Sequence, residues 1–344
     1  MNISFYALSV RMILLTLGVS ACAYAQVIHS IQSGDHPDSS YYDIARIDEN
    51  EFWVGGENGI LTCLDSLGNV SHMQLPVRGR DILKIVPSGQ YVYLAADQGT
   101  IFRYNRLRDT WIYTDFSDQG FGKLTFYDLV VMKSGRLVLS GGHNRIAQGQ
   151  VAIPRGFVAT LDEELLGAPQ IVWRHALMFP FALEYDEAED EVFVAAFNGI
   201  NSQLFSSVDG AETFQRRNTI PGLVHDLLWH QNEMWYSGAK GVRYTKTGLA
   251  GKVDDKPIEM EGEGCIWSLL PMGDQMYSLA YNGAIVAANE EFDSYDFKIR
   301  PSTTSLYEAA AISATKAYII GHGRTILMIE QEMDQSGVTL RYGR

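Results

Sequence analysis

Positive charge is scarce in this sequence. Its 27 Lys and Arg residues are outnumbered by 41 Asp and Glu residues, and the formal net charge is −14 at pH 7. An excess of negative charge repels phosphate groups, which disfavours nucleic acids and anionic lipid surfaces as partners. We therefore expect no nucleic-acid partner.

The motifs of several common enzyme classes are also missing. The sequence contains no glycine-rich phosphate loop, no G-x-S-x-G, no H-E-x-x-H and no paired C-x-x-C. His225 and His230 are five positions apart, which puts them on opposite faces of a strand and makes them a poor metal-binding pair. We expect no metal site and no cofactor.

Long stretches with helical periodicity are absent, and a strand–turn–strand unit recurs in their place. Its clearest copy is FWVGGENGILTCLD at 52–65, where Asn58 and Gly59 can supply the positive φ angles of a two-residue hairpin turn. Further copies lie at 91–104, 136–162, 191–200, 233–244, 275–288 and 316–329. The turn glycines recur about every forty residues except across an insertion in the third copy, and they are Gly59, Gly99, Gly156, Gly199, Gly241, Gly283 and Gly323.

Each hairpin is preceded by another apolar strand and followed by a more polar one. Four strands per unit and a period near forty are typical of β-propeller blades, which bury both sheet faces by packing around an axis. The sequence therefore predicts an all-β fold, a single seven-bladed β-propeller with four antiparallel strands per blade over residues 26–344. The ring closes between the termini, and either 27–32 or 338–343 could supply the outermost strand of the last blade.

Residues 1–25 form a predicted signal peptide. Arg11 precedes an apolar run, and Ala23-Tyr24-Ala25 is an A-x-A cleavage pattern. Alternatively, Val19-Ser20-Ala21-Cys22 matches a bacterial lipobox, with Cys22 as a lipid anchor. Both alternatives place the mature protein outside the cytoplasm, periplasmic or secreted. The apolar run is too short to remain as a membrane span, and we expect no other.

The two remaining cysteines, Cys63 and Cys265, fall in the first and sixth units. Those blades are not neighbours in the predicted ring, so the two sulfur atoms are too far apart for a disulfide. We expect two free thiols.

The hairpin FWVGGENGI at 52–60 resembles the core repeat of the photosystem II assembly factor Ycf48/HCF136-like propellers, within the broader BNR-repeat, sialidase-like class. The segment 207–214 resembles the Asp-box S-x-D-x-G-x-T-[FW] of that class, with Ala211 at the usual glycine position. The resemblance implies a structural turn at the blade periphery, held by Ser207, Asp209, Thr213 and Phe214. The class includes assembly factors, glycosidases and carbohydrate binders, so the resemblance implies no single activity.

The predicted inner strands begin with a recurring pair, an aromatic or basic residue followed by an acid. The pairs are Tyr42-Asp43, Arg80-Asp81, Tyr127-Asp128, His225-Asp226 and Tyr307-Glu308, with Phe181-Ala182 and Ile266-Trp267 in the other two units. Inner strands line the channel of a propeller, so these side chains could form a ligand or cation site at its mouth. Alternatively, each acid accepts hydrogen bonds from its own inter-blade turn and is part of the scaffold.

An insertion at 143–155 interrupts the third unit and carries Arg145 and Arg155, a locally basic stretch in an acidic protein. A long loop on a rigid scaffold is a candidate interaction site, and a tolerated surface loop is the alternative.

We expect an exported, non-catalytic and monomeric scaffold that binds a protein or a carbohydrate on its loop face. The candidate binding residues are Arg145, Arg155, Tyr127, Asp128, His225 and Trp267. The alternative is a glycoside hydrolase or lyase at the channel mouth, and its candidate acids are Asp43, Asp81, Asp128, Asp226 and Glu308.

Overall fold

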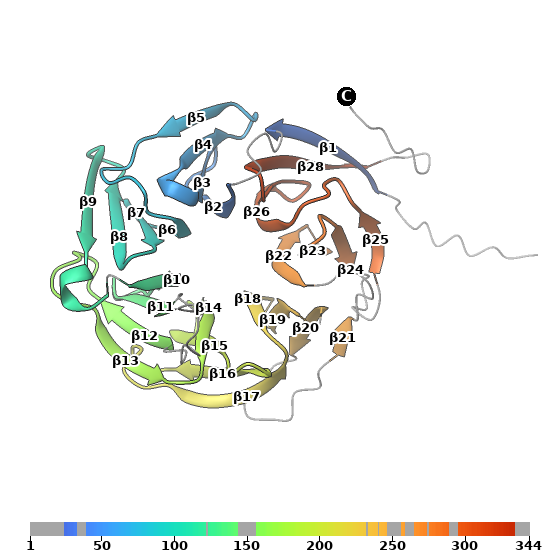
Figure 1. The fold of residues 1–344 in the computed structure, drawn as a ribbon. Coiled ribbons are helices and arrows are strands. Elements are labelled where there is room, and N and C mark those ends of the chain that lie inside the picture. Colours follow the sequence, from blue (N-terminus) through green and yellow to red (C-terminus); the bar gives the residue numbers. More distant parts are fainter. Residues whose placement is uncertain are drawn as a thin grey trace, which may run out of the picture.

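The computed structural model of the chain describes residues 24–32, 39–121, 123–143, 156–231, 233–239, 241–245, 256–258, 265–273, 275–288 and 295–333. Within these ranges the strands form seven four-stranded sheets, in which every pairing is antiparallel. Figure 1 shows the sheets arranged around a central axis, with one edge strand of each facing that axis. The predicted all-β propeller of four-stranded antiparallel blades is confirmed.

We number the blades in chain order and give their strands from the axis outward. Blade 1 comprises β2 (Tyr41–Arg46), β3 (Glu51–Gly56), β4 (Leu61–Asp65) and β5 (Val70–Met73). Blade 2 comprises β6 (Ile82–Ser88), β7 (Tyr91–Ala96), β8 (Thr100–Asn105) and β9 (Thr110–Asp115). Blade 3 comprises β10 (Leu124–Val131), β11 (Leu137–His143), β12 (Gly156–Leu161) and β13 (Gln170–His175). Blade 4 comprises β14 (Phe179–Asp186), β15 (Glu191–Phe197), β16 (Asn201–Ser207) and β17 (Gln215–Pro221).

The remaining blades follow the same plan. Blade 5 comprises β18 (Val224–His230), β19 (Glu233–Gly238), β20 (Gly241–Thr245) and β21 (Lys256–Ile258). Blade 6 comprises β22 (Ile266–Met272), β23 (Gln275–Ala280), β24 (Ile285–Ala288) and β25 (Tyr295–Ile299). Blade 7 comprises β26 (Leu306–Ser313), β27 (Lys316–Gly321), β28 (Thr325–Met333) and β1 (Tyr24–Gln32). Two short 3₁₀ turns, η1 (Glu57–Gly59) and η2 (Ser117–Gln119), complete the described elements.

The N-terminal strand closes the ring. Strand β1 pairs with β28 as the outermost strand of blade 7, and Ile28 lies opposite Ile329. Of the two strands predicted for this position, the N-terminal one therefore takes it, while 338–343 lies outside the described residues. Inner strand β2 of blade 1 also contacts β26 of blade 7, so the first and last blades meet at the axis as well.

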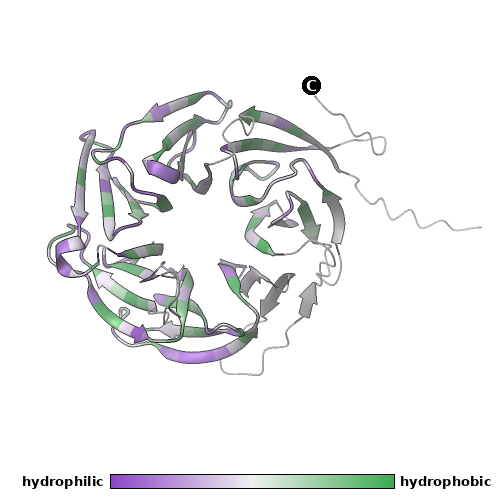
Figure 2. Ribbon diagram, viewed as in Figure 1, coloured by the Kyte–Doolittle hydropathy of each residue, from purple (hydrophilic) through white to green (hydrophobic). Residues whose placement is uncertain are grey.

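The second strand of each blade is buried along almost all of its length because the neighbouring blades cover both of its faces. Trp53 of β3 is 1% exposed and packs on Tyr104 and Trp111 of blade 2, at ring-centroid distances of 5.2 and 6.0 Å. Figure 2 shows the contrasting hydrophilic character of the outer strand β17. Burial of a large apolar side chain contributes about 1.5–3 kcal/mol, so the contacts between blades are a main source of stability.

The glycine that ends several second strands has a packing function. A Cβ at Gly56, Gly238 or Gly321 would lie 2.2, 1.9 or 2.2 Å from the carbonyl oxygen of Ser40, Leu223 or Ser305, respectively. The residue after each glycine donates its N–H to that same carbonyl, at 2.9–3.0 Å. Glycine is needed here because the second strand approaches the start of the inner strand too closely for a side chain.

The hairpin turn of blade 1 differs from the prediction. Asn58 and Gly59 do adopt positive φ angles of 58° and 75°, but they belong to the 3₁₀ turn η1 rather than to a two-residue turn. The Gly56 N–H donates to Ile60 O at 3.1 Å, which leaves a loop of three residues. Gly156 was also expected in a turn, yet it begins β12, where an added Cβ would lie 2.1 Å from Met178 O.

The turn between β16 and β17 is held by one carboxylate. Asp209 Oδ1 accepts the Ser207 hydroxyl at 2.6 Å and the N–H groups of Glu212 and Thr213 at 3.0 Å each. Its Oδ2 accepts the Thr213 hydroxyl at 2.5 Å. These hydrogen bonds, with that of Ser207 first, lower the pKa of Asp209. Ala211 has a φ of 62°, so alanine occupies a left-handed position that favours glycine.

Cys63 and Cys265 are free, as predicted, and both are half-buried. Burial raises the pKa of each thiol to about 11, so both stay protonated at neutral pH. Within the described ranges, the structure contains no helix with the length and apolar character needed to span a bilayer.

Candidate functional site

A β-bulge occurs at the same place in every inner strand. In β2, for example, Tyr41 and Asp43 are consecutive in register, which leaves Tyr42 unpaired. A bulge adds one unpaired residue and redirects its side chain. The bulged residues of blades 1 to 7 are Tyr42, Leu83, Tyr127, Phe181, His225, Trp267 and Tyr307. All seven line one cavity of about 290 Å³ at the centre of the ring.

The residue that follows the bulge supplies charge to the same cavity. Blades 1, 3, 5 and 7 contribute Asp43, Asp128, Asp226 and Glu308, and blade 2 contributes Lys84. Blades 4 and 6 have Ala182 and Ser268 at this position. The structure thus brings four of the five predicted aromatic-or-basic plus acid pairs into this cavity, together with Phe181 and Trp267 of the other two units.

The predicted pair Arg80-Asp81 is wrong as a member of this ring. Strand β6 begins at Ile82 and its bulge falls at Leu83, so Lys84 takes the place expected for Asp81. Arg80 instead binds Asp115 at 3.0 Å, and Asp81 accepts the N–H of Asn58 at 2.9 Å. The number of residues between each pair and the start of the second strand of its blade is the sequence signal that would have identified Lys84, because Asp81 lies farther from Tyr91 than the other acids lie from their second strands.

The acids connect neighbouring inner strands. Asp43 Oδ2 accepts the N–H of Ile85 in blade 2 at 2.5 Å, and Asp128 Oδ2 accepts that of Leu183 in blade 4 at 2.7 Å. Asp226 Oδ2 accepts the N–H of Leu269 in blade 6 at 2.9 Å. The expected scaffold role is therefore present in altered form, because each bond reaches the next blade rather than the acid's own inter-blade turn.

Two more carboxylates complete these connections. Glu184 of blade 4 was missed by the sequence analysis, and its Oε1 accepts the N–H of Trp229 in blade 5 at 3.0 Å. Glu308 of blade 7 accepts the hydroxyl of Ser268 in blade 6. The bonds to Asp226 and Glu308 each involve one carboxylate oxygen, Oδ2 and Oε1 respectively, whereas both oxygens of Asp128 accept backbone N–H groups, from Leu129 at 2.8 Å and Leu183 at 2.7 Å.

Lys84 lies on one side of this acidic ring. Its Nζ is 3.7 Å from Asp43 Oδ1 and 3.8 Å from Asp128 Oδ1. Burial opposes its charge, but Asp43, Asp128 and the more distant Glu308 and Asp226 hold the pKa of Lys84 well above its usual value. The lysine is therefore charged, and it is the single cation among the described residues that line the cavity.

One lysine does not neutralise four lining acids. Burial, followed by repulsion from neighbouring acids, raises the pKa of Glu308 to about 8. Burial also raises the pKa of Asp226 to about 7 and that of Glu184 to about 7. The ring therefore exchanges protons with solvent near neutral pH, where its excess negative charge is costly in the absence of another cation.

The bulged aromatic residues and His225 form a collar above the acids. We use the term aromatic collar for Tyr42, Tyr127, Phe181, His225, Trp267 and Tyr307. The His225 and Trp267 rings are 4.1 Å apart, and Trp267 meets Tyr307 edge-on at 5.3 Å. Tyr127 and Phe181 form a second contact at 5.3 Å across blades 3 and 4. Burial lowers the pKa of His225 to about 4, so this imidazole is neutral at physiological pH.

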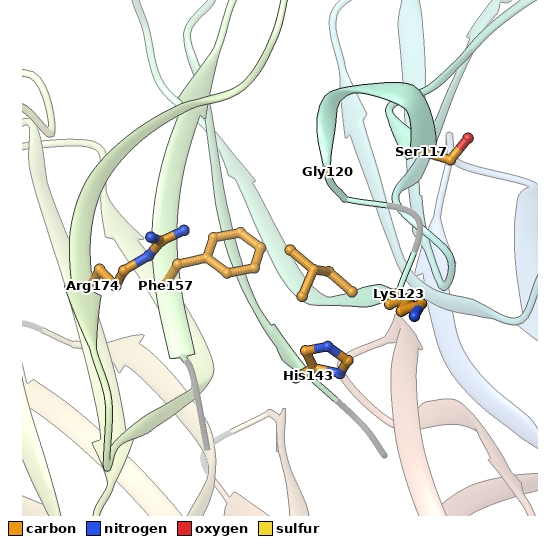
Figure 3. A pocket seen from close by; sticks show the side chains of 7 residues that line it. Ser117, Gly120, Lys123, His143, Phe157 and Arg174 are labelled. Carbon is orange, nitrogen blue, oxygen red and sulfur yellow. The ribbon is translucent and has the colours of Figure 1, made fainter. Parts of the chain in front are cut away.

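A larger cavity of about 510 Å³ lies at the periphery of blades 2 and 3. Figure 3 shows Arg174 and Phe157 on one side of it and Lys123 on the other. His143, the last residue of β11, also lines it. The predicted loop residues Arg145 and Arg155 lie outside the described residues, so their binding role stays a prediction.

The other candidate residues fall into two groups. Tyr127, Asp128, His225 and Trp267 all line the central cavity, whereas Ser207, Asp209 and Thr213 hold the peripheral turn described above. Phe214 packs against the core between blades 3 and 4. Within the described part of the chain, no group of three or more His, Cys, Asp or Glu side chains is arranged to hold a metal ion.

Comparison with known proteins gives relatives in structure alone. No family model and no curated protein matches the sequence. YCF48 from Cyanidioschyzon merolae superposes with a TM-score of 0.65 at 10% identity, over 88% of this chain and 98% of that one. The chain has a Ycf48-like propeller fold. A structure of YCF48 bound to D1 peptide gives a TM-score of 0.65 at 12% identity, covering 91% of this chain and 97% of that one.

The same fold is also found in a lyase. A catalytically inactive virginiamycin B lyase from Staphylococcus aureus, solved with quinupristin, superposes with a TM-score of 0.66. Its identity to this chain is 10%, over 89% of this chain and 99% of that one. The architecture therefore supports binding and catalysis alike, and the function has to be argued from the site.

Proposed function

We propose that this propeller is a non-catalytic binding protein that holds a segment of a partner protein at the mouth of its central channel. The observation that carries the proposal is the aromatic collar above a ring of carboxylates in one cavity. Aromatic side chains supply a large contact area with few rotatable bonds, and polar groups beneath them fix the orientation of a ligand. A peptide bound to YCF48, which has the same architecture, gives independent support.

The repeated positions of the acids favour binding over catalysis. In blades 1, 3 and 5, one oxygen of the carboxylate is engaged by a backbone N–H of the next blade. A nucleophile or general base that is held in this way is less free to move toward a substrate. The same carboxylates are well placed as fixed acceptors because their orientation is already set.

Catalysis on a carbohydrate is the second candidate function. Asp226 and Glu308, with pKa values of about 7 and 8, could each donate a proton to a leaving group. This candidate requires turnover of a glycan, which the amide variants Asp226→Asn and Glu308→Gln would abolish without loss of the fold.

Export from the cytoplasm is part of the proposal. Cleavage after Ala25 would leave Gln26–Gln32 of β1, and the pairing of β1 with β28 extends over this part. Processing at Cys22 would leave all nine residues of β1 behind the lipid anchor. Both routes preserve ring closure, and we propose an extracytoplasmic monomer of residues 26–344 or a lipoprotein anchored through Cys22.

Selection from a displayed random peptide library tests the binding function. We expect the protein to enrich peptides whose capture is lost in Trp267→Ala and kept in Trp173→Ala. Trp173, on the outer strand β13, is half-buried like Trp267 but lies away from the cavity. Loss of a central aromatic contact typically costs about 2 kcal/mol or more of binding free energy.

The outcomes separate the two functions. Failure to enrich any peptide, or equal enrichment by the Trp267→Ala variant, would contradict a peptide site at the channel mouth. A screen of polysaccharides for released sugar, performed on the wild type beside the two amide variants, would then test the catalytic candidate. The 143–155 loop is tested in parallel by replacing it with Asn-Gly.

A further inference from the structure

We infer that the channel mouth recognises a basic side chain of the bound segment, lysine or arginine, and seats it against the half of the cavity that belongs to blades 5, 6 and 7. This inference rests on the proposed function and adds the chemical class of the ligand. The acidic half is defined by His225, Asp226, Trp267, Tyr307 and Glu308.

The charges in the cavity are distributed unevenly. Lys84 is within ion-pair distance of Asp43 and Asp128, in blades 1 and 3. Asp226 and Glu308, in blades 5 and 7, form no ion pair with any described residue. The ion pairs of Lys84 are therefore confined to the side of blades 1 and 3, and no described lining residue on the side of blades 5 to 7 is a cation.

The walls of the acidic half also suit a cation. The rings of Trp267 and Tyr307 are perpendicular, at 89°, and His225 closes the opposite side at 4.1 Å from Trp267. Aromatic faces attract an ammonium or guanidinium group, by about 0.5–2 kcal/mol depending on desolvation. A carboxylate below and aromatic faces beside it are the two groups that a cationic side chain binds best.

The indole of Trp267 supplies an independent observation. Its Nε1–H is buried and has no hydrogen-bond acceptor among the described residues. A buried donor without an acceptor costs about 1–3 kcal/mol. Trp267 lines the cavity, so a carbonyl oxygen of a bound peptide is a candidate acceptor for this donor.

The fold does not require an ionisable residue directly after the bulge in every blade. Blades 4 and 6 carry Ala182 and Ser268 where the other blades carry an ionisable residue, and their inner strands have the same bulge. Replacing buried charges with apolar residues is often neutral or stabilising in proteins. Asp226 and Glu308 each bond the neighbouring blade through one oxygen, and these bonds do not explain why both residues carry charge without an ion pair, whereas a cationic ligand does.

Proton exchange gives the inference a second readout. The charged and titratable groups that face Asp226 and Glu308 are Glu184, Lys84, Asp43, Asp128, His225 and Tyr307. A bound cation would stabilise the ionised carboxylates, so binding should release protons and become tighter as the pH rises from 6 to 8. Arginine is the preferred probe because its own charge does not change over this range.

The experiment uses one peptide from the library selection in three forms. The forms carry arginine, its neutral isostere citrulline, or glutamate at the position that the selection enriches, and their affinities are measured by titration calorimetry. We expect citrulline to weaken binding about tenfold, equivalent to one ion pair of about 1.4 kcal/mol. We expect glutamate to abolish binding.

Two protein variants with opposite expected effects complete the test. Asp226→Asn with Glu308→Gln should weaken the arginine peptide about tenfold and leave the citrulline peptide unchanged. Lys84→Met should strengthen the arginine peptide, because it makes the cavity more negative. Opposite signs in two cavity variants cannot result from a general loss of folding.

The outcomes distinguish this inference from the function on which it rests. Enriched peptides without a basic residue, or equal affinity for the arginine and citrulline forms, would overturn the inference and leave peptide binding intact. Failure to enrich any peptide overturns both. Affinity for the arginine form that does not change between pH 6 and pH 8 would contradict the role of Asp226 and Glu308.

Discussion

The Lys84→Met substitution removes the positive charge between Asp43 and Asp128 and keeps a side chain of similar length. The Asp43 and Asp128 side chains are 4% and 10% exposed, and the lysine nitrogen is 3.7 and 3.8 Å from their Oδ1 atoms. Removal of one partner from a buried ion pair typically costs about 3–5 kcal/mol. Because the Lys84 side chain retains 30% exposure, solvent screening lowers this cost. We expect a loss of about 2–3 kcal/mol in the free energy of unfolding at pH 8.

The loss should be smaller in acid. Burial is the largest influence on Asp43 and Asp128, and it raises the pKa of both even with Lys84 present. Without Lys84 these pKa values rise further, so a larger fraction of the two acids is protonated at pH 5.5 than at pH 8, and less uncompensated charge is buried. We expect the loss to fall to about half or less at pH 5.5. Equilibrium unfolding in urea, followed by tryptophan fluorescence at both pH values, measures it.

The control is an exposed ion pair of the same length. Lys316 Nζ lies 3.7 Å from Glu330 Oε2, and the two side chains are 24% and 41% exposed. Lys316→Met should cost less than about 1 kcal/mol, with little difference between the two pH values. If Lys84→Met costs no more than Lys316→Met, or the same at pH 5.5 as at pH 8, the electrostatic account of the channel is refuted.

Three further predictions concern the ring and its closure. The free energy of unfolding of the wild type should fall from pH 5.5 to pH 8.5, because the pKa values of Asp226 and Glu308 are raised to about 7 and 8 and the folded chain binds protons that the unfolded chain has released. Urea unfolding at several pH values should show a weaker pH dependence for Asp226→Asn with Glu308→Gln, and an equally steep dependence would contradict this assignment. Gly238→Ala should lower the free energy of unfolding by about 2 kcal/mol or more, since the added Cβ would lie 1.9 Å from Leu223 O. Gly79 has open space around it and a φ of 73°, so Gly79→Ala measures backbone strain alone and should lower the free energy of unfolding by about 1 kcal/mol. A chain that begins at Gln26 should unfold like the full chain. A chain that begins at Ser33 lacks β1 and should lose the cooperative unfolding transition, because β28 becomes an unpaired edge strand. Equal unfolding midpoints for the two truncated chains would argue against closure of the ring by β1.

The blade repeat could be predicted because its sequence follows from its packing. The apolar run at Phe52–Gly56 fits a strand covered on both faces, and the final glycine follows from the contact with Ser40 O. The same combination recurs in several blades, which identifies both the strand and its end. The fold class was therefore accessible from local patterns alone.

The register of the inner strands could not be predicted from the same patterns. Arg80-Asp81 matches the aromatic-or-basic plus acid pair as well as its counterparts do, and it precedes an isoleucine as Asp43 does. The position of the bulge decides which residues face the channel, and this position depends on pairing with β7. Lys84 was missed for this reason, although it is the single cation among the described lining residues.

The connections between blades were inaccessible for a different reason. The carboxylate of Glu184 meets the N–H of Trp229, and that of Asp128 meets the N–H of Leu183, across a boundary between sheets. No local sequence pattern marks such pairs because the partners are placed by the ring as a whole. The sequence predicted four of the acids at the axis, Asp43, Asp128, Asp226 and Glu308, but neither Glu184 nor the bonds by which these acids bridge neighbouring blades.

These bridges explain how the acids can serve the scaffold and a ligand together. The oxygen that accepts a backbone N–H fixes the carboxylate, and the fixed carboxylate presents its second oxygen at a set position in the cavity. Such preorganisation lowers the entropy lost when a ligand binds. It also predicts that Asp226→Asn, which keeps an acceptor for Leu269 N–H, will preserve the fold and lose charge selectivity. Asp226→Leu should lose both, since the N–H of Leu269 would be left without its acceptor.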